Sequence, residues 1–325
     1  MVSGRLTFAQ GPSAPGPQAA PEPRDQPRAA IAFMVGATVL IAATTLLAKA
    51  LGTAALGTAL PPLQVTFGRY LFAALAIFAA AAVLRPPMTT RQARWHLARI
   101  LCGWGGVTLM FASVALIPLA EATAITFLNP IFAMILAIPL LGEQVGRVRW
   151  TAAVIALAGA IVLLRPGTGV LEWGALLALG AAVLLGTEVL IIKRLTRHES
   201  LLATLVWANG LGLVIAASTA LPGWQPPTMA QWAGLAALGL TMAAAQGLFV
   251  NAMARADASF ITPFGYLTLV FAGLYDAALF DVWLDGLGWV GAALILMGAG
   301  LLAWREGQRS KAAKPLAQRP PPPEG

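Results

Sequence analysis

Charged residues, cysteines and histidines are scarce in this chain. Of its 325 residues only 10% are Asp, Glu, Lys or Arg, whereas a soluble domain carries about a quarter. The one cysteine, Cys102, excludes an internal disulfide framework, and with the two histidines it forms no zinc-site or nucleophilic pattern. A GxxxxGK[ST] phosphate loop is also absent. The sequence therefore predicts no metal, no cofactor and no enzyme, and both His96 and His198 are expected at the surface.

Apolar residues dominate instead. They make up 58% of the chain, and its mean hydropathy is +0.77. Helices that are apolar on all sides require lipid as their solvent. Ten apolar segments have close to the length of about 20 residues that crosses a bilayer: 30–50, 63–84, 96–117, 119–141, 148–165, 171–193, 200–221, 230–253, 256–280 and 286–304. We therefore expect an all-α polytopic membrane protein with ten transmembrane helices.

Lys and Arg residues gather in alternate connections. The connections near 85–94, 147–149, 193–197 and 255 and the C-terminal tail carry several, whereas the intervening connections hold only Arg165. Because basic loops stay on the cytoplasmic side, both termini are predicted to be cytoplasmic. The net charge of +8 is then a sign of topology and not of a nucleic-acid partner. Segments 1–28 and 305–325 are expected to be disordered cytoplasmic tails.

Two stretches of the chain resemble each other, 119–166 and 255–304. Each begins with an acid between alanines, Glu121 or Asp257, and reaches Ile-Thr four residues later. Each then runs through an apolar helix interrupted by a proline, Pro130 or Pro263. A unit used twice is typical of transporters built from two repeats. Ten helices divide into five-helix repeats, 30–165 and 171–304, and the odd number requires the second repeat to be inverted.

The two similar stretches and their motifs resemble the EamA-type transporters of the drug/metabolite transporter superfamily. The resemblance covers about residues 30–304 and rests on PLAEAT at 118–123, NP at 129–130, LGE at 141–143, ADAS at 256–259 and PFGY at 263–266. The family usually ends its ninth helix with Gly-Glu, where this chain has Phe280-Asp281. The resemblance implies secondary transport of small organic molecules, such as vitamins, nucleoside-like compounds or amino acids. The Arg69 region and the Arg99 position resemble subgroups that import riboflavin or S-adenosylmethionine.

Ionisable side chains within the spans are candidates for substrate binding or ion coupling, because charge at bilayer depth costs roughly 2.5–3.5 kcal/mol on insertion scales. Four lie at such positions: Lys49, Arg69, Glu188 and Asp276. Each has an alternative structural interpretation. Lys49 is expected to reach the outer headgroups. Arg69 and Asp276 are of opposite sign at similar depth and form a candidate ion pair, whereas Glu188 either pairs with the basic residues at 193–194 or binds substrate or a proton.

Uncharged polar and aromatic side chains within the spans complete the candidate site. Those named for substrate binding are Trp104, Thr126, Asn129, Gln246, Asn251, Thr262, Phe264 and Tyr266. The alternative for the aromatic residues is lipid contact or core packing. Pro130 and Pro263 each remove a helical hydrogen bond, and the freed carbonyls are expected to face a cavity. Glu121 and Asp257 are expected to cap helix starts, and Glu143 and Asp281 to order the following turns.

The sequence thus predicts a secondary active transporter of the inner membrane, working by alternating access and coupled to protons through Glu188 or Asp276. Its partners are a small-molecule substrate and the lipid bilayer, and it is a monomer or a homodimer. A membrane-embedded lipid-modifying enzyme is one alternative, which the short and nearly uncharged outer loops disfavour. A channel or an accessory membrane protein is another.

Overall fold

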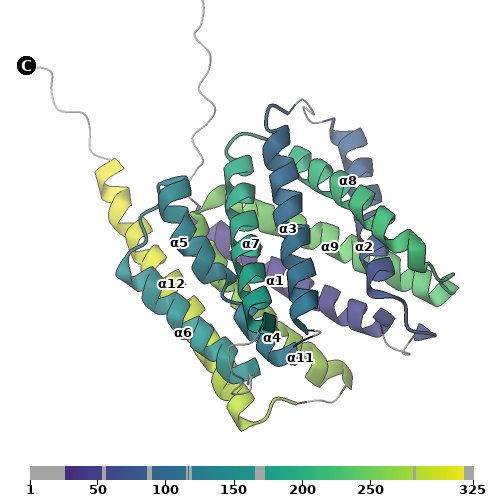
Figure 1. Ribbon diagram of the computed structural model, residues 1–325. Coiled ribbons are helices and arrows are strands. Elements are labelled where there is room, and N and C mark those ends of the chain that lie inside the picture. The colour runs from purple at the N-terminus through teal and green to yellow at the C-terminus, as the bar shows by residue number, and fades with distance from the viewer. Residues whose placement is uncertain are drawn as a thin grey trace, which may run out of the picture.

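The structure is a computed structural model that describes residues 26–52, 56–85, 90–114, 116, 119–164, 173–280 and 283–317. The side chains of Glu121 and Asp276 and all of Arg165 and Asp281 lie outside the described part. Every regular element within these ranges is a helix, and the helices form one bundle (Figure 1). The all-α prediction is therefore confirmed for the described residues.

Eight long helices form most of the bundle: α1 (Pro27–Gly52), α2 (Pro62–Leu84), α3 (Ala93–Val114), α6 (Arg147–Leu164), α7 (Trp173–Thr196), α8 (Leu201–Ala220), α9 (Met229–Arg255) and α12 (Gly286–Ala317). A short 3-10 turn, η2 (Leu221–Gly223), follows α8. The two remaining apolar segments are interrupted. The first comprises α4 (Leu119–Thr126) and α5 (Asn129–Leu141), and the second α10 (Ala258–Ile261), η3 (Thr262–Tyr266) and α11 (Leu267–Phe280).

Nine helical segments among the described residues are long and apolar enough to cross a membrane. The remaining predicted span, 96–117, corresponds to α3, whose first turns carry Arg94, His96 and Arg99 and are therefore less apolar. Ten crossings thus stay a prediction. The last helix differs from the expectation, because α12 extends to Ala317 and includes much of the tail that was expected to be disordered from 305. The Ala, Lys, Arg, Glu and Gln residues of that stretch are strong helix formers.

The interruptions occur at the predicted prolines. Pro130 lies in the first turn of α5 and Pro263 in the first turn of η3. The carbonyls of Thr126 and Phe127 beside the first break both accept hydrogen bonds. This differs from the expectation that the carbonyls freed by the proline face a cavity. The side-chain amide of Asn129 donates to the carbonyl of Thr126 at 2.9 Å, and the hydroxyl of Tyr266 donates to that of Phe127 at 2.7 Å. The break is therefore closed by side chains, one of them from the other repeat.

Small residues let the helices pack closely. The most extensive contacts pair α6 with α12, α1 with α9, α3 with α7 and α2 with α8. Between α6 and α12 the contact is reciprocal: a Cβ on Gly159 would lie 2.7 Å from the carbonyl oxygen of Gly291, and one on Gly291 would lie 2.8 Å from that of Gly159. Such close approach is how helices associate in lipid, where apolar side chains gain little by leaving the solvent.

Candidate solute-binding cavity

A cavity of about 430 Å³ lies between the helices of the two halves. It is lined by residues of α1, α3, α5, α7 and α9, namely Ile41, Arg99, Asn129, Leu185, Glu188, Val189, Ile192, Met242, Ala245, Gln246, Phe249 and Val250. The lining is mostly apolar with four polar side chains, which is the usual composition of a site for a small organic ligand. Three of the four, Asn129, Glu188 and Gln246, were predicted from the sequence.

Glu188 and Arg99 form the charged part of the cavity. The Arg99 Nε lies 3.7 Å from Oε1 of Glu188, which is an ion pair that is too long for a hydrogen bond. Gly103 of α3 makes room for Glu188, since a Cβ there would lie 2.8 Å from its Oε2. Of the two alternatives for Glu188, a pair with the basic residues at 193–194 is therefore not the one found, because its ion-pair partner, Arg99, comes from another helix.

The two amides of the cavity are held by hydrogen bonds. Gln246 accepts from Nδ2 of Asn209 through its Oε1 at 2.8 Å, and Asn209 also donates to the carbonyl of Leu205. Asn129 is anchored by its bond to the Thr126 carbonyl. Both amides are thus fixed in orientation before any solute arrives, which reduces the ordering that binding requires.

Five other predicted residues lie away from the cavity. The hydroxyls of Thr126 and Thr262 donate to the carbonyls of Ala122 and Ala258, four residues earlier in each case. Phe264 packs edge-on against Phe260 with ring centroids 5.6 Å apart, and Tyr266 stacks on Phe127 at 5.9 Å. Asn251 accepts from Arg255 at 2.5 Å within α9. Phe264 and Tyr266 therefore contribute to the core, which was their alternative interpretation.

Two further predicted residues, Trp104 and Arg69, also lie outside the cavity lining. Trp104 is 47% exposed and lines a separate, smaller pocket of about 60 Å³ with Tyr70 of α2. The Arg69 guanidinium lies over the Tyr70 ring, 4.4 Å from its centroid. The side chain of Asp276 lies outside the described part, so its pairing with Arg69 stays a prediction.

Arg99 is the polar residue of the cavity lining that was not among the predicted site residues. It is 4% exposed, and its Nη1 donates to the carbonyl of Thr204 at 3.3 Å. The sequence contains one signal for Arg99, because it is a second charge within a predicted span and has the opposite sign to Glu188. Its position near the predicted start of a span made it resemble one of the basic residues that mark a helix end.

A second group of buried charges surrounds the junction between α9 and α10. Glu143 accepts from the backbone N–H groups of Ala258 and Ser259, both at 2.9 Å. Arg149 donates to Oγ of Ser259 at 2.8 Å and pairs with Asp257 at 2.9 Å. The predicted capping by the Asp257 side chain is therefore wrong, since Glu143 occupies the amides at the start of α10 and Asp257 turns to the arginine.

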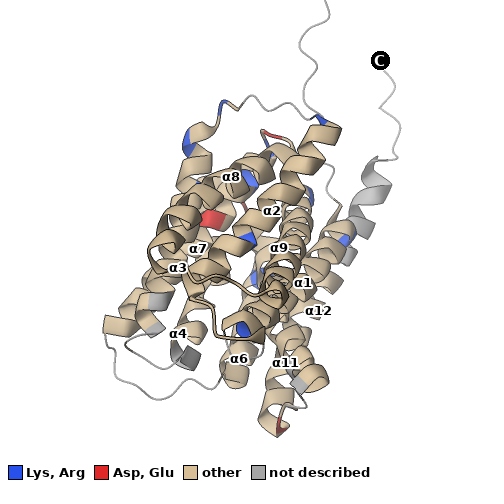
Figure 2. Cartoon of the chain, turned by 90° about the vertical axis from the view of Figure 1, so that its right-hand side faces the viewer, with Lys and Arg blue, Asp and Glu red and all other residues tan. Residues whose placement is uncertain are grey.

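Lys193 completes this junction. Its Nζ donates to the carbonyls of Met253 at 2.7 Å and of Ala256 at 2.5 Å, which lie at the C-terminal end of α9. A cation at this end of a helix satisfies unpaired carbonyls and interacts favourably with the helix dipole. We refer to Glu143, Arg149 and Lys193 together as the junction charges. Figure 2 shows most basic positions in the upper part of the molecule in that view.

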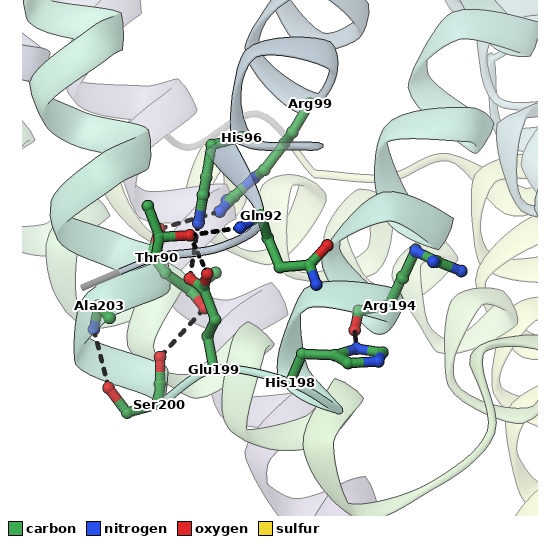
Figure 3. Close-up of polar contacts among 10 residues, drawn as sticks. Thr90, Gln92, His96, Arg99, Arg194, His198, Glu199, Ser200 and Ala203 are labelled. Atoms are coloured by element: carbon green, nitrogen blue, oxygen red, sulfur yellow. Dashed lines mark hydrogen bonds and ion pairs between the residues drawn. The ribbon is translucent and has the colours of Figure 1, made fainter. Parts of the chain in front are cut away.

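His96 lies in a third polar cluster, so the prediction of a surface histidine is wrong for it. Its ring is fully buried, its Nε2 lies 2.6 Å from Oε2 of Glu199, and it stacks on Trp207. Figure 3 shows Thr90 also reaching Glu199, which connects the segment before α3 to the segment before α8. His198 is exposed, as predicted, and bonds to the carbonyl of Arg194 at 2.9 Å.

Known proteins share both the sequence pattern and the architecture. The EamA-like transporter family matches residues 28–165 and 172–304. A riboflavin transporter of Vibrio cholerae is 30% identical over 262 residues, 79% of this chain and 88% of that protein. A riboflavin transporter of Rhizobium johnstonii is 33% identical over 263 residues, 78% and 84% of the two chains. An S-adenosylmethionine uptake transporter of Rickettsia bellii is 25% identical over 252 residues, 77% and 87%.

A solved crystal structure shares the fold, with a TM-score of 0.75 over 86% of this chain and 99% of the other, at 21% identity. Family and relatives are transporters and not enzymes, which removes the lipid-modifying alternative. Nine helical segments among the described residues have the length and composition of membrane spans, and the cavity lies between the two matched segments. The chain is therefore a multi-pass membrane transporter of small metabolites that belongs to the EamA-like transporter family.

Proposed function

We propose that this protein is a secondary active transporter that moves riboflavin across the inner membrane by alternating access. The observation that carries the mechanism is the cavity itself, because its walls come from both halves of the chain. Movement of one half against the other would open the cavity to each side in turn, as in carriers built from two repeats. The cavity is formed within one chain, so the monomer is the proposed transport unit.

Inverted five-helix halves, 30–165 and 171–304, fit the contacts of the bundle. Exchange of the halves converts the α1–α9 pair into the α7–α3 pair, and these are two of the most extensive helix contacts. The reciprocal Gly159–Gly291 contact likewise fits a twofold relation between α6 and α12. The proposed orientation, with both termini cytoplasmic, is tested by reporter fusions at each end. Fusions on opposite sides of the membrane would contradict it.

Riboflavin suits the chemistry of the cavity lining. The volume lies within the range of about 300–1,000 Å³ that drug-sized ligands occupy. Glu188 and Arg99 are of opposite sign and close together, which favours an uncharged solute over an ion. Phe249 offers an aromatic face, and Asn129 and Gln246 offer amides for the polar groups of a flavin. The two relatives with the higher identities, 30% and 33%, are named riboflavin transporters.

Riboflavin counterflow in proteoliposomes tests this substrate. Vesicles loaded with unlabelled riboflavin should accumulate external labelled riboflavin transiently, because a carrier exchanges solutes whereas a channel only equilibrates them. Trp173, which is exposed outside the cavity, offers a matched control through Trp173→Phe, which should transport normally. Wild-type vesicles that show no counterflow would refute riboflavin as the substrate.

S-adenosylmethionine is the second candidate. The observation in its favour is Glu188, whose carboxylate lines the cavity and can meet a cationic solute. Relatives named S-adenosylmethionine uptake transporters are 25% identical. The same vesicles, assayed with labelled S-adenosylmethionine, distinguish the two candidates by which solute shows counterflow.

Proton coupling through Glu188 or Asp276 is the proposed energy source. A carboxyl group that alternates between protonated and ionised states during the cycle would make uptake depend on the pH gradient. Glu188→Gln and Asp276→Asn remove each carboxylate in turn, and the coupling residue is the one whose loss abolishes gradient-driven uptake but leaves counterflow. Both variants retaining a normal pH dependence of uptake would exclude these carboxylates as coupling groups.

A further inference from the structure

Arg99 uses little of its hydrogen-bonding capacity. The side chain lines the cavity and is 4% exposed, yet its Nε has no hydrogen-bond partner among the described residues. The Nη1 donates to the carbonyl of Thr204 in a long bond of 3.3 Å, and Oε1 of Glu188 lies 3.7 Å from the Nε. A guanidinium carries five N–H donors in one plane, and a buried donor without a partner costs free energy.

The side chains around Arg99 do not accept hydrogen bonds from all of its N–H groups. Among the described residues, Glu188 is the ion-pair partner of Arg99, at 3.7 Å. The carboxylate of Glu188 is itself lodged against Gly103 of α3, which holds it beside the guanidinium. In the part of the chain that the structure describes, neither Asn129 nor Gln246 bonds to Arg99: Asn129 donates to the Thr126 carbonyl, and Gln246 accepts from Asn209. The unused donors of Arg99 are therefore available to a solute in the cavity.

We propose that Arg99 is the substrate-recognition residue and binds a planar pair of hydrogen-bond acceptors on the solute. A guanidinium presents parallel N–H groups that match two acceptors in one plane, which an ammonium group cannot do. Glu188 acts as a positioning residue that keeps the guanidinium in place. The substrate class is thus a solute with a flat two-acceptor edge, and the inference rests on the proposed function of the cavity.

Both candidate solutes carry such an edge. Riboflavin carries two, the ring nitrogen N1 beside the C2 carbonyl and the ring nitrogen N5 beside the C4 carbonyl, and in S-adenosylmethionine it is the carboxylate. Analogues remove each edge in turn: 1-deazariboflavin and 5-deazariboflavin replace N1 or N5 by C–H, and decarboxylated S-adenosylmethionine lacks the carboxylate. Because a hydrogen bond to a charged group contributes about 1.5–3 kcal/mol, the wild-type protein should bind the parent roughly 10- to 100-fold more tightly than the analogue that lacks the edge bound by Arg99.

The experiment measures the affinity ratio of parent to analogue in the wild-type protein and in variants. Arg99→Lys keeps the charge but loses the planar fork, and Arg99→Met loses both. Both variants should bring the ratio close to one, mainly by weakening the parent. Arg94→Met is the matched control, since Arg94 lies on the same helix but is exposed, and it should keep the wild-type ratio.

Each outcome discriminates between the two proposals. A wild-type protein that binds the parent and all of its edge-deleted analogues equally well overturns the role of Arg99, and this result needs no variant to fold. An unchanged ratio in Arg99→Lys overturns it as well. A wild-type protein that binds neither riboflavin nor S-adenosylmethionine overturns the proposed function first, and the inference that rests on it fails with it.

Discussion

Arg99 in the cavity is as buried as the junction charges but is bound very differently, and Glu188 beside it is partly exposed. At the α9–α10 junction Glu143, Arg149 and Lys193 make hydrogen bonds of 2.5–2.9 Å to backbone groups or to the side chains of Asp257 and Ser259. In the cavity, Arg99 and Glu188 are 3.7 Å apart, and the bond from Nη1 of Arg99 to the Thr204 carbonyl is 3.3 Å long. Burial alone therefore does not separate structural from functional charges.

The junction charges and the cavity charges differ in how many of their possible hydrogen bonds are made within the protein. A buried charge that stabilises a fold must have its hydrogen bonds satisfied within the protein, because nothing else compensates its lost hydration. A charged group that binds a transported solute must keep some donors or acceptors without a protein partner until the solute binds. The comparison predicts that substitutions at the junction mainly lower stability and that substitutions at the cavity mainly change transport.

The largest loss of stability is expected for Lys193→Met. Methionine has a similar length but leaves the carbonyls of Met253 and Ala256 without their cation. Hydrogen bonds to charged groups contribute about 1.5–3 kcal/mol each, so the variant should lose about 3 kcal/mol or more. Thermal denaturation in detergent measures it, with Arg197→Met at an exposed site as the control. A variant as stable as the control would show that the junction is not held by its charges.

Glu143→Gln should have the next largest effect. The amide retains one acceptor for the N–H groups of Ala258 and Ser259 and places an NH₂ group where the other oxygen was. A loss of about 2 kcal/mol is expected in the same assay. Asp257→Asn provides the comparison at the same junction, and since Asp257 is half exposed its loss should stay below about 1 kcal/mol. The reverse order of the two variants would contradict the capping role of Glu143.

The sequence contains the architecture in its composition and periodicity. Apolar segments of bilayer length and the breaks at Pro130 and Pro263 follow from local physics, because hydropathy and a missing N–H act within a few residues. The same local reasoning identified Asn129, Glu188 and Gln246 as polar groups that need an internal partner. All three line the cavity.

The partners of these groups depend on tertiary packing and were not accessible. Glu188 pairs with Arg99 across two helices, and Glu143 caps a helix of the other repeat. A lone sequence also cannot separate an aromatic residue in the core from one that faces a cavity, which is why Tyr266 was a candidate site residue. His96 was expected at the surface because arginines surround it, but Glu199 closes over it.

Tyr266→Phe tests that correction and should have a smaller effect than the junction variants. Loss of the hydroxyl leaves the Phe127 carbonyl without its donor and should cost about 1–2 kcal/mol of stability, with the ring stack preserved. Transport affinity should remain unchanged, because the side chain is buried in the core and does not line the cavity. A raised KM with normal stability would return Tyr266 to the binding site.

The smallest change in stability, yet a clear change in transport, is expected for Gly103→Ala. The new Cβ would lie 2.8 Å from Oε2 of Glu188, so the carboxylate must move, and the flexible end of a side chain moves at little cost. Stability should stay within about 1 kcal/mol of wild type, since alanine also favours the helix. Gly105→Ala is the matched control, because its Cβ would meet only Leu184 at 3.3 Å. If both variants transport alike, the position of Glu188 is irrelevant to the solute, and the distinction between saturated and unsaturated charges loses its functional meaning.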